Sequence, residues 1–319
     1  MSPLLSVIIP THSPNSNRFE KTLCGLREQQ LAHDSWELLV IDNASPNPQL
    51  FADFDLSWHP SGTVIREERL GLTWARIAGI QASQGEYLVF VDDDNVLHPN
   101  YLENTIEIFQ QNLRLGAIGG KSLPEFEVEP EHWVIQFYKC LALRDLGGDP
   151  WVSSYTEVSN RGLHSPKQYP EFAPIGAGMA LRRQAAEAYV KRITSNGSRL
   201  VMDRTGRSLT SGGDNDIVLT LINAGWEIGY FPQLELTHLI PASRLTRDYL
   251  SRVNRASSQS WVQVLDIHGI RLWQKIPRWT VLPRQVRAFF RYQAWKDAAS
   301  YVRWQGACGL FAGLGALPK

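Results

Sequence analysis

Cysteine and long apolar runs are both scarce in this chain of 319 residues. Its three cysteines, Cys24, Cys140 and Cys308, are odd in number and far apart, which excludes a disulfide framework and a Cys-x-x-Cys zinc site. We expect buried thiols in a reducing compartment. Because no stretch of 18 apolar residues occurs, no membrane-spanning helix is expected. The N-terminal segment has no basic start and is broken by Pro10, so we expect no signal peptide.

Glycine and proline, at 24 and 18 residues, are close to average usage, which excludes collagen-like and low-complexity classes. The apolar fraction of 43% excludes a disordered chain and indicates a substantial core. The length fits one large domain or two small ones.

The whole chain has no excess of acidic or basic residues, but the balance of charge differs along the chain. Residues 1–270 carry 23 basic and 31 acidic side chains, whereas residues 271–319 carry nine basic side chains and one acid, Asp297. The basic segment is also rich in Trp, Tyr and Phe. This composition fits contact with an anionic membrane surface, and it equally fits a helix packed on the acidic body. A nucleic-acid surface is disfavoured because the acidic body would repel phosphates.

Apolar runs and helical spacing alternate through about residue 120, which predicts an α/β unit with a mostly parallel sheet. Strands are expected at 5–10, 36–42, 63–69 and 86–92, and helices at 18–31, 72–83 and 99–112. Weak periodicity predicts long loops and short helices over 123–174. Further strands are expected at 177–182, 227–231 and 234–238, and further helices at 215–224, 246–267 and 283–304.

Three adjacent aspartates follow the apolar run ending at residue 91. Their charges repel at close range, and a bound cation would remove that cost. Oxygen ligands favour Mg²⁺ or Mn²⁺, completed by phosphate oxygens, and His238 at a later strand end is a further candidate ligand. The alternative is a solvated loop in which Asp94 or Asn95 caps the next helix.

Other polar clusters also stand at expected strand ends or helix starts. Asp42 ends the second strand, where it could contact a nucleotide base or simply form an Asx-turn. Arg76, after Gly71, lies where a phosphate could sit at a helix start, although a surface arginine beside an ordinary turn is an equal alternative. Asp214 and Asp216 open a helix, either as N-terminal caps or with one carboxylate acting as general base.

Together these segments resemble the family 2 inverting glycosyltransferases of the GT-A fold, over roughly residues 4–245. The resemblance rests on the order and spacing of SVIIPTHS, LLVIDNAS, GLTWARIAGIQASQGEYLVFVDDDN, IGAGMALRR and GGDNDIVLTLINAGW. The segment LTHLIPASRLTRDYL is similar to one in bacterial polysaccharide-assembly members. The resemblance implies a nucleotide-diphospho-sugar transferase domain over residues 1–245, with a mostly parallel central sheet flanked by helices. Residues 246–319 would form a C-terminal helical extension.

The resemblance also implies roles for individual positions. Asp94 would be the main metal-binding carboxylate and Asp214 the catalytic base, with Asp216 as a second acid two residues on. The family's usual Glu-Asp pair before the catalytic helix is Gly213-Asp214 here, so Asp216 is the reserve base. The remaining implied positions are Pro10, Thr11, Asp42, Asp92 and Asp93 for the nucleotide, and Gly176, Ala177 and Gly178 at the sugar and acceptor side.

The expected protein therefore binds a nucleotide-sugar, usually a UDP-sugar, and a divalent cation, Mn²⁺ or Mg²⁺. Its acceptor would be a glycan or a lipid-linked sugar, and its place the cytoplasm, held peripherally at the inner membrane face by the C-terminal segment. The alternatives are a catalytically inactive nucleotide-sugar-binding scaffold and a sugar nucleotidyltransferase. The segment after the first strand, THSPNSNRF, lacks the Gly-rich loop typical of a nucleotidyltransferase and the GxGxxG of a dehydrogenase.

Overall fold

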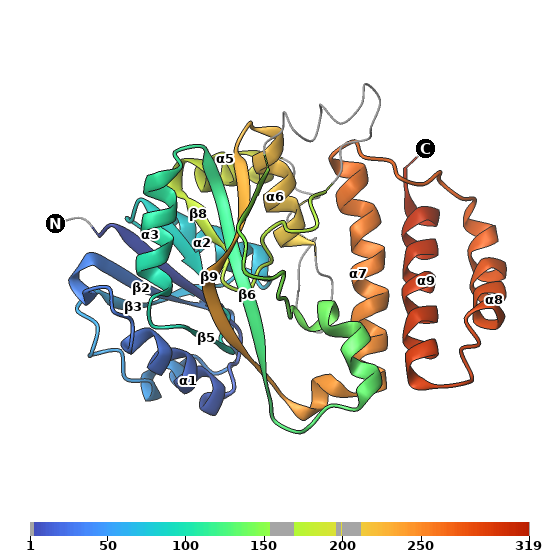
Figure 1. Ribbon diagram of the computed structural model, residues 1–319, viewed down its shortest axis with the longest axis horizontal. Helices are drawn as coiled ribbons and strands as arrows, with labels where there is room; N and C mark the ends of the chain where they lie inside the picture. The colour runs from blue at the N-terminus through green and yellow to red at the C-terminus, as the bar shows by residue number, and fades with distance from the viewer. Residues whose placement is uncertain (1–2, 154–168, 196–198, 200–211, 319) are drawn as a thin grey trace.

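The computed structural model describes residues 3–153, 169–195, 199 and 212–318 (Figure 1). Its described strands form one sheet in the order β3-β2-β1-β4-β8-β6-β9-β5, with β7 paired to β9. The strands are β1 (Leu5–Thr11), β2 (Trp36–Asn43), β3 (Gly62–Glu67), β4 (Tyr87–Phe90), β5 (Asn95–Leu97), β6 (Leu115–Phe126), β7 (Trp151–Ser153), β8 (Ala180–Arg182) and β9 (Glu227–Ile240). Strands β1 to β4 pair in parallel, as does β6 with β9. Strands β5, β7 and β8 pair antiparallel with their neighbours.

Helices lie against the sheet and also form a separate row at one end of the molecule (Figure 1). The helices that accompany the sheet are α1 (Ser16–Arg27), α2 (Leu72–Ala82), α3 (Tyr101–Gln111), α5 (Arg183–Thr194) and α6 (Gly213–Asn223). The row consists of α7 (Arg247–Ile267), α9 (Ala298–Ala316) and α8 (Val281–Arg291). Figure 1 places this row beyond α6, so the sequence's basic end lies far from β2 and β3.

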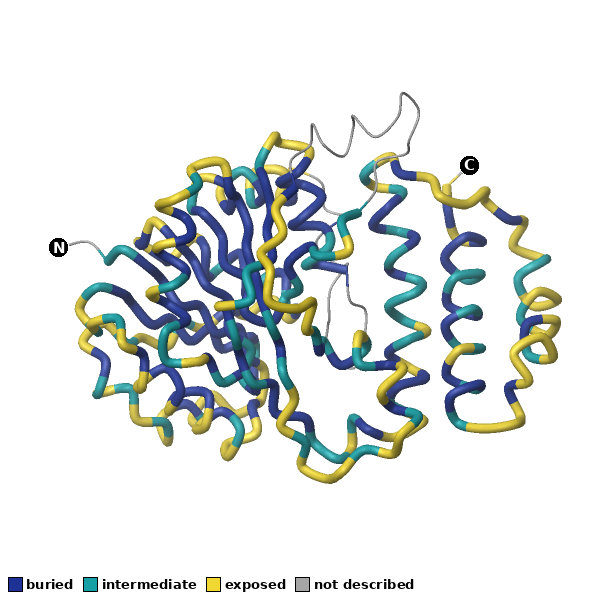
Figure 2. Tube along the Cα trace, in the orientation of Figure 1, coloured by how far each residue is buried: buried dark blue, intermediate teal, exposed yellow. Residues whose placement is uncertain are grey.

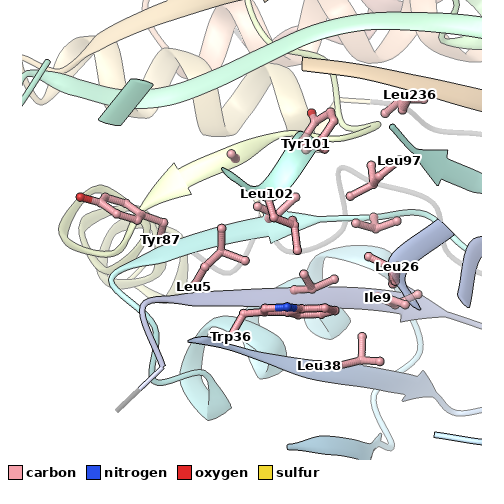
Figure 3. Close-up of a cluster of buried hydrophobic side chains, with 14 of the residues drawn as sticks. Leu5, Ile9, Leu26, Trp36, Leu38, Tyr87, Leu97, Tyr101, Leu102 and Leu236 are labelled. Carbon is pink, nitrogen blue, oxygen red and sulfur yellow. The ribbon is translucent and has the colours of Figure 1, made fainter. Parts of the chain in front are cut away.

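The core has two layers because successive side chains of a strand point to opposite faces of the sheet. Val7 and Ile9 belong to the cluster drawn in Figure 3, together with Trp36 and Tyr101. Ile8, between them, belongs to a second cluster on the other face. Since both faces are covered, the central strands are apolar at consecutive positions, and the sequence-based prediction of an α/β fold with buried strands is confirmed.

The region 123–174, predicted as long loops and short helices, contains a short helix as expected and also strand structure that was not predicted. Strand β6 runs to Phe126, and a 3-10 helix, η3, covers His132–Leu141. The two strands predicted at 227–231 and 234–238 are one continuous strand, β9, whose pairing with β6 shifts register between Gly119 and Lys121. A side chain at Gly120 would overlap the carbonyl oxygens of Phe231 and Leu234, so glycine permits this close approach. Residues 154–168 of the predicted loop lie outside the described residues.

The prediction of one helix over 283–304 is wrong. The chain leaves α8 after Arg291, passes through Gln293 at a φ of 50°, and starts α9 with Asp297 as its N-cap. The sequence also suggested one apolar stripe along this helix, with Val286, Phe290, Ala294, Ala298 and Val302 at four-residue steps. This stripe does not exist, since Val286 and Phe290 are exposed whereas Val302 is fully buried. A spacing of four residues drifts around a helix with 3.6 residues per turn, so five positions at this spacing do not make one face.

The cysteine prediction holds only in part, because Cys24 is exposed and Cys140 is half-buried, whereas Cys308 is buried in α9. Burial raises the pKa of the Cys140 thiol to about 11, so this side chain behaves as an apolar group. No helix in the described part of the chain is long and apolar enough to cross a bilayer.

Helices α7 and α9 approach closely because small residues line their contact. A Cβ at Gly309 would overlap the backbone carbonyl of Arg255, and one at Gly313 would lie 2.9 Å from Val262 Cβ. Figure 2 shows α9 mostly buried between its neighbours. Helix α9 also contacts η3, and Ala299 and Val302 join the cluster around Phe137. The helical row therefore packs on the body, as one of the two alternatives predicted.

We expect Gly309→Ala to destabilise the fold by about 1–3 kcal/mol, because the added methyl group must push the two helices apart. Alanine is the better helix former by about 1 kcal/mol, so intrinsic propensity alone predicts the opposite sign. Urea denaturation of both proteins measures the difference. Gly148→Ala is the matched control, since a Cβ there meets open space. Equal or greater stability of Gly309→Ala would contradict the close contact.

Candidate functional site

A cavity of about 290 Å³ opens at the carboxyl ends of β1, β2 and β4, where ligands of open α/β sheets bind. Its walls also include the starts of α2 and α6, the end of η3, and the segment that follows β9. Ten of the thirteen predicted site residues line it: Pro10, Thr11, Arg76, Asp92, Asp93, Asp94, Gly176, Ala177, Asp214 and His238. The cavity thus brings together residues more than 200 positions apart in the chain.

The aspartate cluster forms the acidic wall of the cavity. The hydroxyl of Thr11, at the end of β1, donates a short hydrogen bond to Asp93 Oδ2. Burial and the charges of Asp94 and Asp92 raise the pKa of Asp93 to about 7, although the Thr11 hydrogen bond lowers it. Such crowding is costly in the absence of a nearby cation, as the sequence suggested.

A cationic side chain also stands at this wall. Strand β5 pairs antiparallel with β9 so that Asn95 lies opposite His238, which sets His238 beside Asp94 with an Nε2–Oδ1 distance of 3.4 Å. In the turn after β9, Arg244 Nη1 lies 2.9 Å from Asp94 Oδ2 and 3.2 Å from His238 Nε2. Burial alone would lower the pKa of Arg244, but the Asp94 charge raises it above its usual value. The guanidinium therefore stays charged in the cavity.

The side chains at this wall fit a divalent cation only if phosphate groups of the substrate also bind that cation. The described residues contain no group of three or more Asp, Glu, His or Cys side chains that could hold a metal ion by themselves. However, Mg²⁺ and similar ions bind one or two protein carboxylates and take further oxygens from substrate phosphates and water. Asp94 and His238, being adjacent, are the residues that would hold such an ion. The pairing of Arg244 with both of them means that a cation would have to share this space with the guanidinium.

Across the cavity, Asp214 opens α6 and is held by backbone groups. The Asn215 amide donates to its Oδ1 over 2.9 Å, and the Gly176 amide donates to its Oδ2 over 3.2 Å. Asp214 remains only partly buried and lines the cavity, so its carboxylate can meet a ligand there. A Cβ at Gly176 would lie 2.7 Å from Arg76 Nη2, so glycine makes room for that guanidinium. Arg76 is itself buried, with its charged end 5.4 Å from the ring of Phe90.

Three predicted residues do not line the cavity. Asp42 is buried, and both of its carboxylate oxygens have partners outside the cavity. Arg66 Nη1 lies 2.5 Å from its Oδ2, and the Ser45 amide donates to its Oδ1. Its neighbour Asn43 lines the cavity in its place. Gly178 has a φ of +72°, and a Cβ there would lie 2.6 Å from the hydroxyl of Tyr101. Gly178 therefore permits this backbone conformation and close packing, and it does not line the cavity as Gly176 and Ala177 do.

Asp216 is also outside the cavity, on the buried side of α6. Its Oδ1 accepts hydrogen bonds from Arg199 Nη2 and lies 2.7 Å from His268 Nε2. Arg199 also contacts Thr220. The Asp216 carboxylate is 1% exposed, and its contacts join α6 to the end of α7. This buried, paired position argues against Asp216 as the reserve base.

The structure adds cavity residues that sequence reasoning missed. Arg244 follows β9, Tyr249 lies in the first turns of α7, and Cys140, Leu141 and Ala142 come from the end of η3. The arginine was visible in the segment after the last strand, but only the β5–β9 pairing shows that it meets Asp94. The region assigned to a separate extension thus contributes Tyr249 to the cavity wall.

Comparison with known proteins identifies relatives among glycosyltransferases. A family model described as glycosyl transferase family 2 matches residues 6–190. Glycosyltransferase AglE of Haloferax volcanii is 31% identical over 106 residues, which are 33% of this chain and 34% of that protein. The teichuronic acid biosynthesis glycosyltransferase TuaG of Bacillus subtilis is 28% identical over 195 residues, 59% of this chain and 75% of TuaG. The amylovoran biosynthesis glycosyltransferase AmsB of Erwinia amylovora is 26% identical over 157 residues, 47% of this chain and 49% of AmsB.

Proposed function

The chain belongs to glycosyl transferase family 2, and on that premise we propose that the protein transfers a sugar from a nucleotide-sugar, most simply a UDP-sugar, to a hydroxyl group of an acceptor. The acceptor is a glycan or a lipid-linked sugar. The relatives TuaG and AmsB are named for the biosynthesis of teichuronic acid and of amylovoran, which supports a glycan acceptor. The matched segments span a third to three quarters of the three relatives, so the activity of the whole chain is our proposal.

One observation carries the proposal: Asp94 and Asp214, 120 positions apart, line the same cavity at the carboxyl ends of the strands. The Asp94 side holds Arg244, a cation able to meet a diphosphate. The Asp214 side offers a partly exposed carboxylate. A donor whose diphosphate lies at Asp94 and Arg244 would therefore present its sugar toward Asp214.

In the proposed reaction Asp214 accepts the proton of the acceptor hydroxyl as its oxygen bonds to the anomeric carbon. The bond from that carbon to the phosphate oxygen breaks, the electron pair leaves with the nucleoside diphosphate, and the anomeric configuration inverts. Asp94 and His238 would hold a divalent cation, which supplies stabilisation of the negative charge growing on the leaving diphosphate. Arg244 adds fixed positive charge beside Asp94, and Arg76 adds it beside Gly176. The Gly176 amide keeps Asp214 oriented by donating to its carboxylate.

A donor panel tests this function directly. The full chain is incubated with UDP-, GDP- and dTDP-sugars, Mn²⁺ and a set of glycan and lipid-linked acceptors, and released nucleotide is measured. We expect release of a nucleoside diphosphate that depends on one donor and is increased by one acceptor class. Release of pyrophosphate from a nucleoside triphosphate and a sugar phosphate would instead assign a nucleotidyltransferase. Nucleotide binding without release under any acceptor would assign an inactive scaffold.

A further inference from the structure

Helices α7, α8 and α9 enclose a second cavity of about 840 Å³, remote from the candidate active site. Its described lining residues include no acid, and they combine arginines with aromatic rings. The principal members are Arg284, Arg287, Arg291, Trp261, Trp273 and Trp279. From its charge and its exposed apolar border we propose that this groove and the outer surface of α8 bind the surface of an anionic phospholipid bilayer. This proposal goes beyond the sugar transfer proposed above and does not depend on it.

Helix α8 carries three distinct faces. Ala288 is buried against α9, and Gln285 donates to the Cys308 carbonyl of that helix. Leu282, Val286 and Phe290 follow one another at four-residue steps and stay exposed, Leu282 at 68% and Phe290 at 63%. Figure 2 shows the outer side of α8 largely exposed. Over only three positions this spacing keeps the side chains on one side of the helix, so an apolar strip faces outward.

The arginines form the second outward face, along the groove. Arg284, Arg287 and Arg291 are spaced by three and four residues, which places them on one side of α8. Arg284 contacts Thr280, whereas Arg287 and Arg291 have no ion pair or side-chain hydrogen bond among the described residues. Two unpaired guanidinium groups beside a roomy, acid-free groove are well placed to meet anionic groups from outside.

Tryptophans border both outward faces. Trp279, just before α8, is 78% exposed, and Trp295, just after it, is also exposed. Indole rings favour the headgroup region of a bilayer, and a helix with an apolar strip beside cations favours an anionic membrane surface. A second copy of the chain is a poorer occupant of this surface, because the contact would bring two strongly basic segments together.

Vesicle sedimentation of the full chain tests the proposal. We expect binding to vesicles that contain phosphatidylglycerol, weaker binding as salt rises, and little binding to pure phosphatidylcholine. Each basic residue at such a surface strengthens partition about fivefold, so Arg287→Gln with Arg291→Gln is expected to weaken it about 25-fold. Lys191→Gln with Arg192→Gln, which removes the same charge from exposed sites on α5, is the matched control and should change partition far less.

A second pair of double variants tests the exposed apolar strip of α8. Leu282→Gln with Phe290→Gln should lower vesicle binding at high salt, where the electrostatic attraction is screened. The same exchange at Leu113 and Val128, which are exposed on the body, should not lower it. Melting curves of all four double variants verify that the proteins are folded before partition is compared.

Several results would overturn the proposal. Equal partition to neutral and anionic vesicles, or an equal loss in either control pair, would remove the assigned surface. If inorganic phosphate displaced the protein from vesicles at constant ionic strength, the groove would be a site for a free anion. If sedimentation without lipid showed an oligomer that Leu282→Gln with Phe290→Gln dissociates, the occupant would be a second copy. Tighter binding to single-stranded DNA than to vesicles would assign the groove to nucleic acid.

Discussion

Asp214→Asn is expected to lower sugar transfer by a factor of about 10²–10⁴, the usual contribution of a general base, while donor binding stays within about threefold of the unchanged protein. The amide cannot accept the acceptor's proton, but it has the size of the carboxylate and can still accept the Asn215 amide hydrogen bond. Nucleotide release with the donor and acceptor found in the panel measures transfer, and calorimetric titration with the nucleoside diphosphate measures binding.

The matched control is Asp216→Asn, the same exchange two residues along the same helix. Asp216 is paired with Arg199 and His268 outside the cavity, and removing one partner of a buried pair is strongly destabilising. We therefore expect Asp216→Asn to lower the melting temperature while transfer by the protein that remains folded persists. Full transfer by Asp214→Asn, or a selective loss of transfer in stable Asp216→Asn, would assign the base elsewhere.

The sequence was most informative where a local pattern marks the end of a strand or the start of a helix, because polar side chains at these ends can line the cavity. Consecutive apolar residues followed by a polar one marked β1 and the segment before Asp92, and strand ends of a parallel sheet must meet at one edge. The convergence of Thr11 and the aspartates could therefore be predicted from local patterns. Asp214 could be placed as well, because acidic residues at a helix start are a local signal.

The sequence was least informative where long-range pairing decides the outcome. Asp42 and Asp214 look alike as acids at element ends, but Asp42 is held by Arg66 from the neighbouring strand β3. The role of Arg244 likewise depends on the pairing of β5 with β9, and β5 has only three residues. Neither contact leaves a periodic pattern in the sequence, since each joins a few side chains from separate elements.

The largest expected effect on donor binding is that of Asp94→Ala. In the unchanged protein we expect Mn²⁺ to raise affinity for the nucleoside diphosphate at least about tenfold, because an ion shared by Asp94 and the phosphates adds charge-assisted contacts. Asp94→Ala should lose this dependence, so that titrations with Mn²⁺ and with a chelator give the same affinity. The exchange also leaves Arg244 without its carboxylate partner, so some affinity should remain without metal.

Arg244→Gln separates the chain's own cation from the metal ion. It removes the guanidinium but leaves Asp94 and His238 in place, so affinity should fall about equally with and without Mn²⁺, and the ratio between the two conditions should persist. A metal dependence unchanged in Asp94→Ala would refute Asp94 as the ligand. If Arg244→Gln instead increased the effect of Mn²⁺ while leaving metal-free affinity unchanged, the guanidinium would be a competitor of the ion and not a partner of the diphosphate, because removing it would only vacate the space beside Asp94 and His238.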